Sequence, residues 1–179
     1  MRYEIVQDTD PQNPRTDMDN LGTMLYVSHK YLLGDRRVDP DEVKTTLHDE
    51  GVISLPVFAF IHGDVHLSTE AFGDPWDSGQ CGVIYTTKAE AAEWLGLDLG
   101  EDRLEALTKE ALKAEVAVFS AYLSGEVFGW VVRDDLGDVT DSCYGYYSRE
   151  DAEADAKGTL ACLLAARAQR NELTVTYGG

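Results

Sequence analysis

Residues 57–69 read VFAFIHGDVHLST, and this stretch decides the fold. Aromatic and β-branched residues on both sides are typical of strands, and Gly63-Asp64 between them is typical of a two-residue hairpin turn. A third apolar run, from Cys81 to Thr86, follows a polar loop. The stretch therefore predicts consecutive antiparallel strands.

A later stretch resembles this one. Residues 118–132 read VFSAYLSGEVFGWVV, again with a Gly-acid pair between two apolar runs. The loops that follow contain Asp77-Ser78 in one half and Asp141-Ser142 in the other, and each half continues with a short strand and an acidic, Ala-rich helix. We interpret the halves as two copies of one ββ-β-α unit. The expected fold class is α+β, with one or two antiparallel sheets and with helices packed on one face.

Local signals place the helices and the remaining strands. Asp39-Pro40 is a favourable helix start, and Thr87 with Glu90 has the sequence of a capping box. Helices are expected over residues 39–48, 87–96 and 102–114 and from residue 148 onward. Further strands are expected over residues 2–6, 116–123, 127–133, 144–147 and 173–177, whereas residues 21–31 fit a strand or a short helix.

Three consecutive segments are expected to pack together as one compact domain. Residues 1–51 contain the N-terminal strand, a turn-rich segment and a helix. Residues 52–100 contain the first ββ-β-α unit, and residues 101–179 contain a helix and the second unit. A chain of 179 residues is long enough for such a domain.

Net charge is the most pronounced global feature. The chain has 33 Asp and Glu but 15 Lys and Arg, which gives a formal net charge of -18. Such a surface repels nucleic acid and anionic lipid, so neither is expected as a direct partner. Three explanations of the acidity stay open: general solubility, a halophilic host, or imitation of the phosphate array of DNA.

The sequence predicts a cytoplasmic protein of the cell that makes or hosts it. Residues 1–10 are polar and acidic, without the apolar segment of a signal peptide, and no apolar run is long enough to span a bilayer. The three cysteines, Cys81, Cys143 and Cys162, are too widely spaced for a CxxC metal site. Free, partly buried thiols are therefore expected.

One pattern invites a metal-site interpretation. His62-x-Asp64-x-His66 supplies ligand types that suit Zn²⁺ or non-haem iron. However, the hairpin turn at Gly63-Asp64 makes the histidines cross-strand neighbours, and a third ligand is not evident. We therefore favour a structural pair, and we assign no metal ligands.

Signatures of catalysis and of cofactor binding are also absent from the sequence. It contains neither a GxxxxGK[ST] nor a GxGxxG phosphate loop. Asp77-Ser78 is interpreted as a turn, and Trp76 as a lid over the core. We expect no cofactor and no catalytic residue. The alternatives are an enzyme with a site around the DPWDSGQ loop (residues 74–80), His62, His66 and Cys143, or a housekeeping protein of a halophile.

Four short motifs carry a resemblance: DNLGTM at residues 19–24, PWDSGQ at 75–80, GVIY at 82–85 and DSCYG at 141–145. With them, the chain resembles, from about residue 19 to 150, a family of small proteins carried by phages, plasmids and other mobile elements. That family has no established enzymatic activity, so the resemblance implies no catalytic residues. It implies a context, because small acidic mobile-element proteins include many inhibitors of host defence, such as antirestriction and anti-CRISPR proteins.

Charge and resemblance together lead to one functional hypothesis. The protein is expected to be a DNA mimic that binds and inhibits a host defence complex through an acidic face. Its partner would be a host protein with a basic nucleic-acid groove, while self-association into a homodimer stays open. The expected partner-binding residues are Asp74, Trp76, Asp77, Asp134, Asp135, Asp138, Asp141, Glu150, Asp151 and Asp155.

Overall fold

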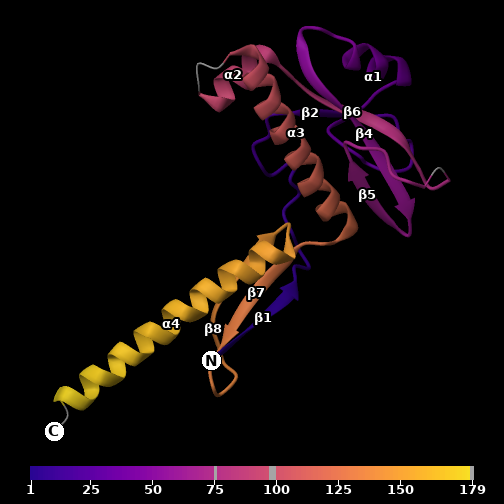
Figure 1. Cartoon of the computed structure of the whole chain (residues 1–179). Helices are drawn as coiled ribbons and strands as arrows, with labels where there is room; N and C mark the ends of the chain where they lie inside the picture. Colours follow the sequence, from indigo (N-terminus) through magenta and orange to yellow (C-terminus); the bar gives the residue numbers. More distant parts are fainter. Residues whose placement is uncertain (75, 97–99, 178–179) are drawn as a thin grey trace. The chain divides into compact units, whose positions relative to one another are not determined.

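The computed structural model describes residues 1–74, 76–96 and 100–177, with side chains described as far as residue 170. The chain forms two compact units. The larger unit is Asn13–Ser124, and the smaller unit combines Met1–Gln12 with Gly125–Gly179. Figure 1 follows the chain through both units. The fold is α+β, as predicted, with an antiparallel sheet in one unit and a mixed sheet in the other.

The two units do not coincide with the three segments expected from the sequence. Strand β1 (Arg2–Gln7) pairs antiparallel with β7 (Phe128–Arg133), so the N-terminal strand belongs with the C-terminal part of the chain. The expected boundaries near residues 51 and 100 both fall inside the larger unit. Local patterns could not show this, because a strand pairing between distant residues leaves no local signal.

The larger unit is built on a five-stranded sheet. Its elements are β2 (Thr23–Tyr26), β3 (Arg36–Arg37), α1 (Pro40–Leu47), β4 (Val52–His62), β5 (Asp64–Ser68), β6 (Ser78–Thr87), α2 (Lys88–Leu95) and α3 (Glu101–Ser124). The strand order is β3-β2-β6-β4-β5, and β2 pairs with β3 in parallel. The predicted hairpin is confirmed, because β4 and β5 are antiparallel and join at Gly63, whose φ is 86°. The turn is shorter than the expected Gly63-Asp64 pair, because Asp64 already begins β5 opposite His62, so His66 does not lie opposite His62 as expected.

Helices pack on both faces of this sheet (Figure 1). Helix α3 lies against β5, β4 and β6, and its Leu112 and Val116 share a core with Ile84. Helix α1 packs against β6 and β4, and its Val43 shares a second core with Val83. Successive strand residues point to opposite faces, so Val83 and Ile84 enter different cores. The larger unit thus departs from the expected single covered face, because apolar runs such as GVIY require burial on both sides.

Helix α3 extends through a predicted strand. β-branched and aromatic residues favoured a strand over residues 116–123, but α3 continues to Ser124. Leu112, Val116 and Phe119 recur at helical spacing and are buried in one core, so burial of a helix face outweighs β-propensity. The proposed ββ-β-α duplication is not confirmed, since a helix stands where the second copy would begin.

A buried ion network ties the first loop of the larger unit to α3. The Arg15 side chain is 4% exposed. Its guanidinium donates hydrogen bonds to both carboxylate oxygens of Asp35, to Glu115 at 2.8 Å and to the Gly22 carbonyl oxygen at 2.6 Å. Burial disfavours the charged form, but the hydrogen bonds to Asp35 and Glu115 outweigh burial and raise the pKa of Arg15. The network joins three chain segments at one buried cation.

The DNLGTM motif at residues 19–24 surrounds this network. Asn20 accepts a hydrogen bond from Arg15 and donates one to the Pro14 carbonyl oxygen. The amide of Gly22 donates to Glu115, and a Cβ on this glycine would lie 2.5 Å from the Leu112 side chain. The motif therefore has a structural role.

The GVIY motif also serves packing. Gly82 lies on the central strand β6, opposite Tyr26 of β2. A Cβ at Gly82 would lie 2.1 Å from the Leu25 carbonyl oxygen, so glycine permits the close approach of the two strands. Gly79, on the same strand, has open space where its Cβ would be.

The smaller unit is a three-stranded sheet with one long helix on it. Strand β7 lies between β1 and β8 (Val139–Tyr146). Helix α4 (Arg149–Tyr177) packs on this sheet, where Trp130, Val132 and Ala156 form the core, and then continues beyond the strands (Figure 1). The strand predicted over residues 173–177 is wrong, because these residues prolong α4.

The predicted helix starts are largely confirmed. Thr87 and Glu90 form both hydrogen bonds of a capping box at α2, and Gly96 ends that helix in the left-handed conformation. Asp39 occupies the N-cap position of α1, although its side chain makes no capping hydrogen bond.

Over the ranges that the structure describes, none of the helices combines the length and the apolar character that crossing a bilayer requires.

Replacing Arg15 with Ala should lower the free energy of unfolding by about 3 kcal/mol, because Asp35 and Glu115 lose their buried counter-ion. Urea denaturation followed by circular dichroism measures this loss. Arg36→Ala is the matched control, since Arg36 is 55% exposed and pairs with Glu42 at the surface, where such a pair contributes at most about 1 kcal/mol. Equal losses in the two variants would contradict the role given to Arg15.

Gly82→Ala should destabilise the protein by at least about 2 kcal/mol, because its new Cβ overlaps the backbone of β2. Gly79→Ala places the same methyl group on the same strand in open space, so its stability should stay unchanged or rise slightly. Thermal unfolding of the two variants side by side checks this difference. A Gly82→Ala variant as stable as Gly79→Ala would show that β2 and β6 do not approach as described.

Candidate functional site

The residues expected to bind a partner fall in both units. Asp74, Trp76 and Asp77 lie in the β5–β6 loop of the larger unit, where Pro75 is outside the described residues. The others lie in the smaller unit, in the β7–β8 turn, on β8 and on the first turns of α4: Asp134, Asp135, Asp138, Asp141, Glu150, Asp151 and Asp155. The structure does not gather all ten residues in one unit.

Hydrogen bonds fix the β5–β6 loop from inside. The Asp74 carboxylate accepts the backbone amides of Trp76 at 2.8 Å and of Asp77 at 3.3 Å. The Ser78 hydroxyl donates to the Asp74 carbonyl oxygen, and the Ile61 amide donates to the Asp77 carbonyl oxygen at 2.9 Å. The loop is therefore a hydrogen-bonded turn, as predicted for Asp77-Ser78, and it is anchored to β4.

Trp76 stands out from this loop. Its side chain is 92% exposed, so the interpretation as a lid over the core is wrong. The neighbouring residue, Asp77, places a carboxylate oxygen 2.9 Å from Nδ1 of His62. The loop thus carries an indole and a carboxylate on two consecutive residues, next to the end of β4.

Aromatic rings cluster on the adjoining hairpin. The Phe60 ring centroid lies 6.3 Å from that of His62, 6.4 Å from that of His66 and 5.7 Å from that of Phe72. Ile61 contributes to the core under α3, so Phe60 and its cross-strand partner His66 point to the other face.

We define the aromatic–acidic surface as Phe60, His62, His66, Phe72, Trp76 and Asp77. The core under α1 takes its sheet residues from β2 and β6, whereas Phe60 and His62 belong to β4 and His66 to β5. Phe60 and Phe72 are half-buried, whereas His62 and Trp76 are exposed. Sequence reasoning missed Phe60 and Phe72. The signal for Phe60 was present, as an aromatic residue alternating with buried ones along β4, whereas Phe72 lies in the β5–β6 loop.

The strands behind this surface contain no Lys or Arg. Residues 45–87, which include all of β4, β5 and β6, have neither residue type. The same stretch contributes carboxylates near the hairpin and the loop at Asp64, Asp74 and Asp77. The surface therefore combines aromatic rings with carboxylates, and His62, which contacts Asp77, is charged only when it is protonated.

The two histidines considered as metal ligands lie on one face of the hairpin. His62 is paired with Asp64 and His66 with Phe60 across the strands, and the imidazole of His62 contacts Asp77. Among the described residues, no three His, Cys, Asp or Glu side chains are grouped as a metal ion requires.

The cysteine and the histidines of the alternative enzyme site belong to different units. Cys143 is exposed on β8, in the smaller unit, whereas His62 and His66 belong to the larger one. All three cysteines are free, and burial raises the pKa of the Cys81 thiol to about 12. Cys143 and Cys162 are exposed, contrary to the expectation of partly buried thiols.

In the smaller unit, the acids of the β7–β8 turn support the turn itself. The Asp134 carboxylate accepts the amides of Leu136 and Asp138. Asp135 accepts hydrogen bonds from the N-terminal ammonium and from Arg167 of α4, and these two cations lower its pKa to about 2. Both carboxylates are thus engaged within the unit.

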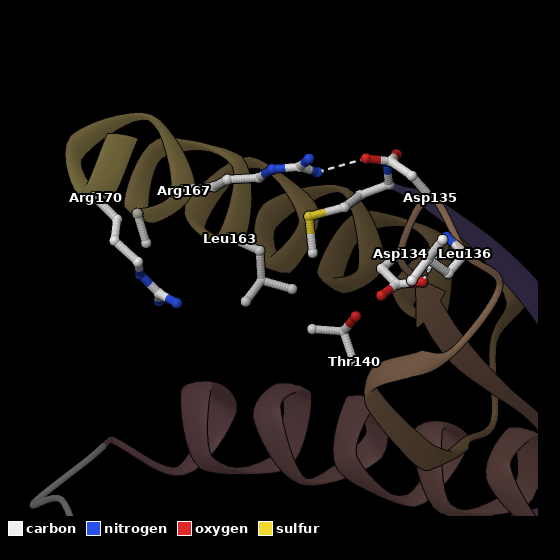
Figure 2. Close-up of a pocket in the computed structure, with 9 residues that line it drawn as sticks. Asp134, Asp135, Leu136, Thr140, Leu163, Arg167 and Arg170 are labelled. Carbon is white, nitrogen blue, oxygen red and sulfur yellow. Dashed lines mark hydrogen bonds and ion pairs between the residues drawn. The ribbon is translucent and has the colours of Figure 1, made fainter. Parts of the chain in front are cut away.

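A hollow of about 600 Å³ lies between this turn and α4. Figure 2 shows Leu163 of α4 and Thr140 of β8 facing each other across it, while Arg167 reaches Asp135. Leu136, at the tip of the turn, is 88% exposed. Charges of both signs line this hollow, so it favours no single class of ligand.

The acids at the start of α4 have mixed roles. The Ser148 hydroxyl accepts the amide of Asp151, which confirms the predicted N-cap. Asp155 accepts hydrogen bonds from the Tyr146 hydroxyl and from Trp130 Nε1, which lies 2.9 Å away. Both hydrogen bonds lower the pKa of Asp155, and the one from Tyr146 has the larger effect. Asp155 therefore links α4 to the sheet.

Comparison with protein-family models, curated proteins and solved structures finds no match to this chain. The resemblance to mobile-element proteins therefore stays a prediction. The functional inference rests on the geometry and charge of the two units, and the aromatic–acidic surface is the most distinctive feature of either.

Asp155→Asn should make the free energy of unfolding depend less steeply on pH in the acidic range. Because hydrogen bonds lower the folded-state pKa of Asp155, this carboxylate stabilises the fold above its unfolded-state pKa, and its contribution is lost as the pH falls through the folded-state value. Urea unfolding followed by circular dichroism at several pH values below neutrality measures the effect. Asp138→Asn is the control. If the free energy of unfolding of Asp155→Asn falls with decreasing pH as steeply as that of the control, Asp155 does not link α4 to the sheet as described.

Proposed function

We propose that the protein binds a host protein with a positively charged nucleic-acid groove and inhibits it by taking the place of DNA. The observation that carries this proposal is the surplus of carboxylates at the surface. A net charge of -18 attracts a cationic groove over a distance of several ångströms and speeds the encounter.

The few cations of the chain do not neutralise this surplus. Most lysines already pair with a neighbouring acid, and Arg15 is buried with two carboxylates. The paired lysines are Lys44, Lys88, Lys109, Lys113 and Lys157. Exposed carboxylates beyond these pairs include those of Asp39, Asp64, Asp102, Asp138 and Asp151. The remaining surface charge is therefore strongly negative.

Both units supply this charge. Acidic residues make up about a fifth of each unit. DNA carries a negative charge about every 1.7 Å along its axis, and a groove built for it offers many Lys and Arg side chains. The carboxylates of either unit can meet such a groove at several points, and the resulting affinity depends steeply on salt.

Affinity capture with displacement by DNA tests the proposal. The tagged protein is immobilised, incubated with nuclease-treated host extract at about 50 mM salt, and eluted in parallel with duplex DNA and with about 0.5 M salt. We expect one retained protein that both eluents release, and whose purified nucleic-acid activity the chain inhibits. Retention that neither DNA nor salt disturbs would refute DNA mimicry.

A charge-reduced variant provides the quantitative arm. Asp39→Asn, Asp64→Asn, Asp102→Asn and Asp138→Asn together remove four exposed charges and should weaken binding of the captured protein about tenfold or more at low salt. The difference from wild type should shrink as salt rises. Four substitutions of exposed Thr or Ser by Ala serve as the control and should leave affinity unchanged.

A further inference from the structure

We infer that the aromatic–acidic surface binds arginine side chains of the partner protein. This inference rests on the proposed function and adds the chemistry of the contact: a planar cation stacked on Trp76 and bonded to the carboxylate of Asp77.

Trp76 has the properties of an interface anchor. Its side chain is 92% exposed, compared with 53% for Trp94, and Trp130 is buried. Tryptophan is among the residues that most often dominate binding energy at protein interfaces. The Asp74 carboxylate accepts hydrogen bonds from the backbone amides of Trp76 and Asp77, so the backbone at these two residues loses little conformational entropy on binding.

The residues around Trp76 favour a cationic ligand over a neutral or anionic one. Asp77 is adjacent to the indole in the chain, Asp74 lies within the same turn, and residues 45–87 contain no Lys or Arg. A cation over an aromatic face is attracted by the ring electrons, and a nearby carboxylate strengthens the attraction. The contact between Asp77 and His62 Nδ1 shows that this carboxylate already faces the ring cluster.

Arginine fits this combination better than lysine. The guanidinium is planar, stacks on aromatic rings and donates two parallel hydrogen bonds to one carboxylate. The ammonium of lysine is compact and strongly hydrated, so it gains less from an indole face. The surface therefore predicts a preference for arginine over lysine at equal charge.

Two other occupants fit the observations less well. Single-stranded nucleic acid also stacks on exposed aromatic rings, but it requires a basic groove, which β4, β5 and β6 do not supply. A second copy of this chain would bring a net charge of -18 against the same surface, and like charges repel.

Titration with short peptides tests the inference. Arginine, lysine and citrulline peptides of equal length are added to the full chain, and affinity is measured by calorimetry at low salt. We expect the arginine peptide to bind more tightly than the lysine peptide, and citrulline not to bind. Trp76→Ala should weaken arginine binding about tenfold, while Trp94→Ala, the same substitution at another exposed indole, should leave it within about twofold.

A second variant and a nucleic-acid arm complete the design. Asp77→Asn keeps the shape of the loop and removes the charge, so it should also weaken arginine binding. Equal affinities for arginine and lysine, equal losses in the two Trp variants, or tighter binding of a single-stranded oligonucleotide would each overturn the inference. If the captured protein is displaced by DNA yet binds Trp76→Ala as tightly as wild type, the proposed function stands and this contact surface does not.

Discussion

The larger unit depends on the buried guanidinium of Arg15. This one cation pairs with both Asp35 and Glu115 and also donates to the Gly22 carbonyl oxygen, so it joins the first loop, the segment before β3 and the middle of α3. Desolvating such a charge is unfavourable unless every donor finds a partner, and here the guanidinium reaches four acceptor groups. The requirement fixes the path of the chain around the sheet.

The burial of Arg15 leaves one cation fewer at the surface. The chain has few basic residues. Arg15 is buried, and most lysines pair with a nearby acidic residue. These pairs leave the large surplus of carboxylates in place, so the surface stays strongly negative. Many acids nevertheless have local duties: Asp134 closes a turn, Asp135 binds α4, and Asp155 joins Tyr146 to Trp130. The exposed carboxylates that have no such structural role carry the proposed interaction.

Local sequence signals predicted much of the fold. The β4–β5 hairpin, the capping box at Thr87 and the N-cap at Ser148 each follow from a few neighbouring residues, and each is observed. The strand predicted over residues 116–123 failed because its β-forming residues also repeat at helical spacing, and only the core under α3 decides between the two. The pairing of β1 with β7 joins distant parts of the chain, so no local pattern could reveal it.

The candidate site was predicted in part. Asp74, Trp76 and Asp77 were all expected among the partner-binding residues, but Trp76 was also interpreted as a lid over the core, because a large aromatic residue is usually buried. The rings of Phe60 and Phe72 were overlooked, since their cluster forms only when β4 and the loop after β5 meet. The absence of Lys and Arg from residues 45–87 was visible in the sequence and is the signal that would have drawn attention to this surface.

One measurement tests the central claim directly: the indole N–H signals of the three tryptophans in an NMR titration with an arginine peptide. Trp76, Trp94 and Trp130 each give one signal, and they differ in exposure from 92% to 53% to 3%. If the aromatic–acidic surface receives arginine, the Trp76 signal moves progressively with peptide while those of Trp94 and Trp130 stay in place. A stationary Trp76 signal in the presence of bound peptide, or equal movement of Trp76 and Trp94, would contradict the account.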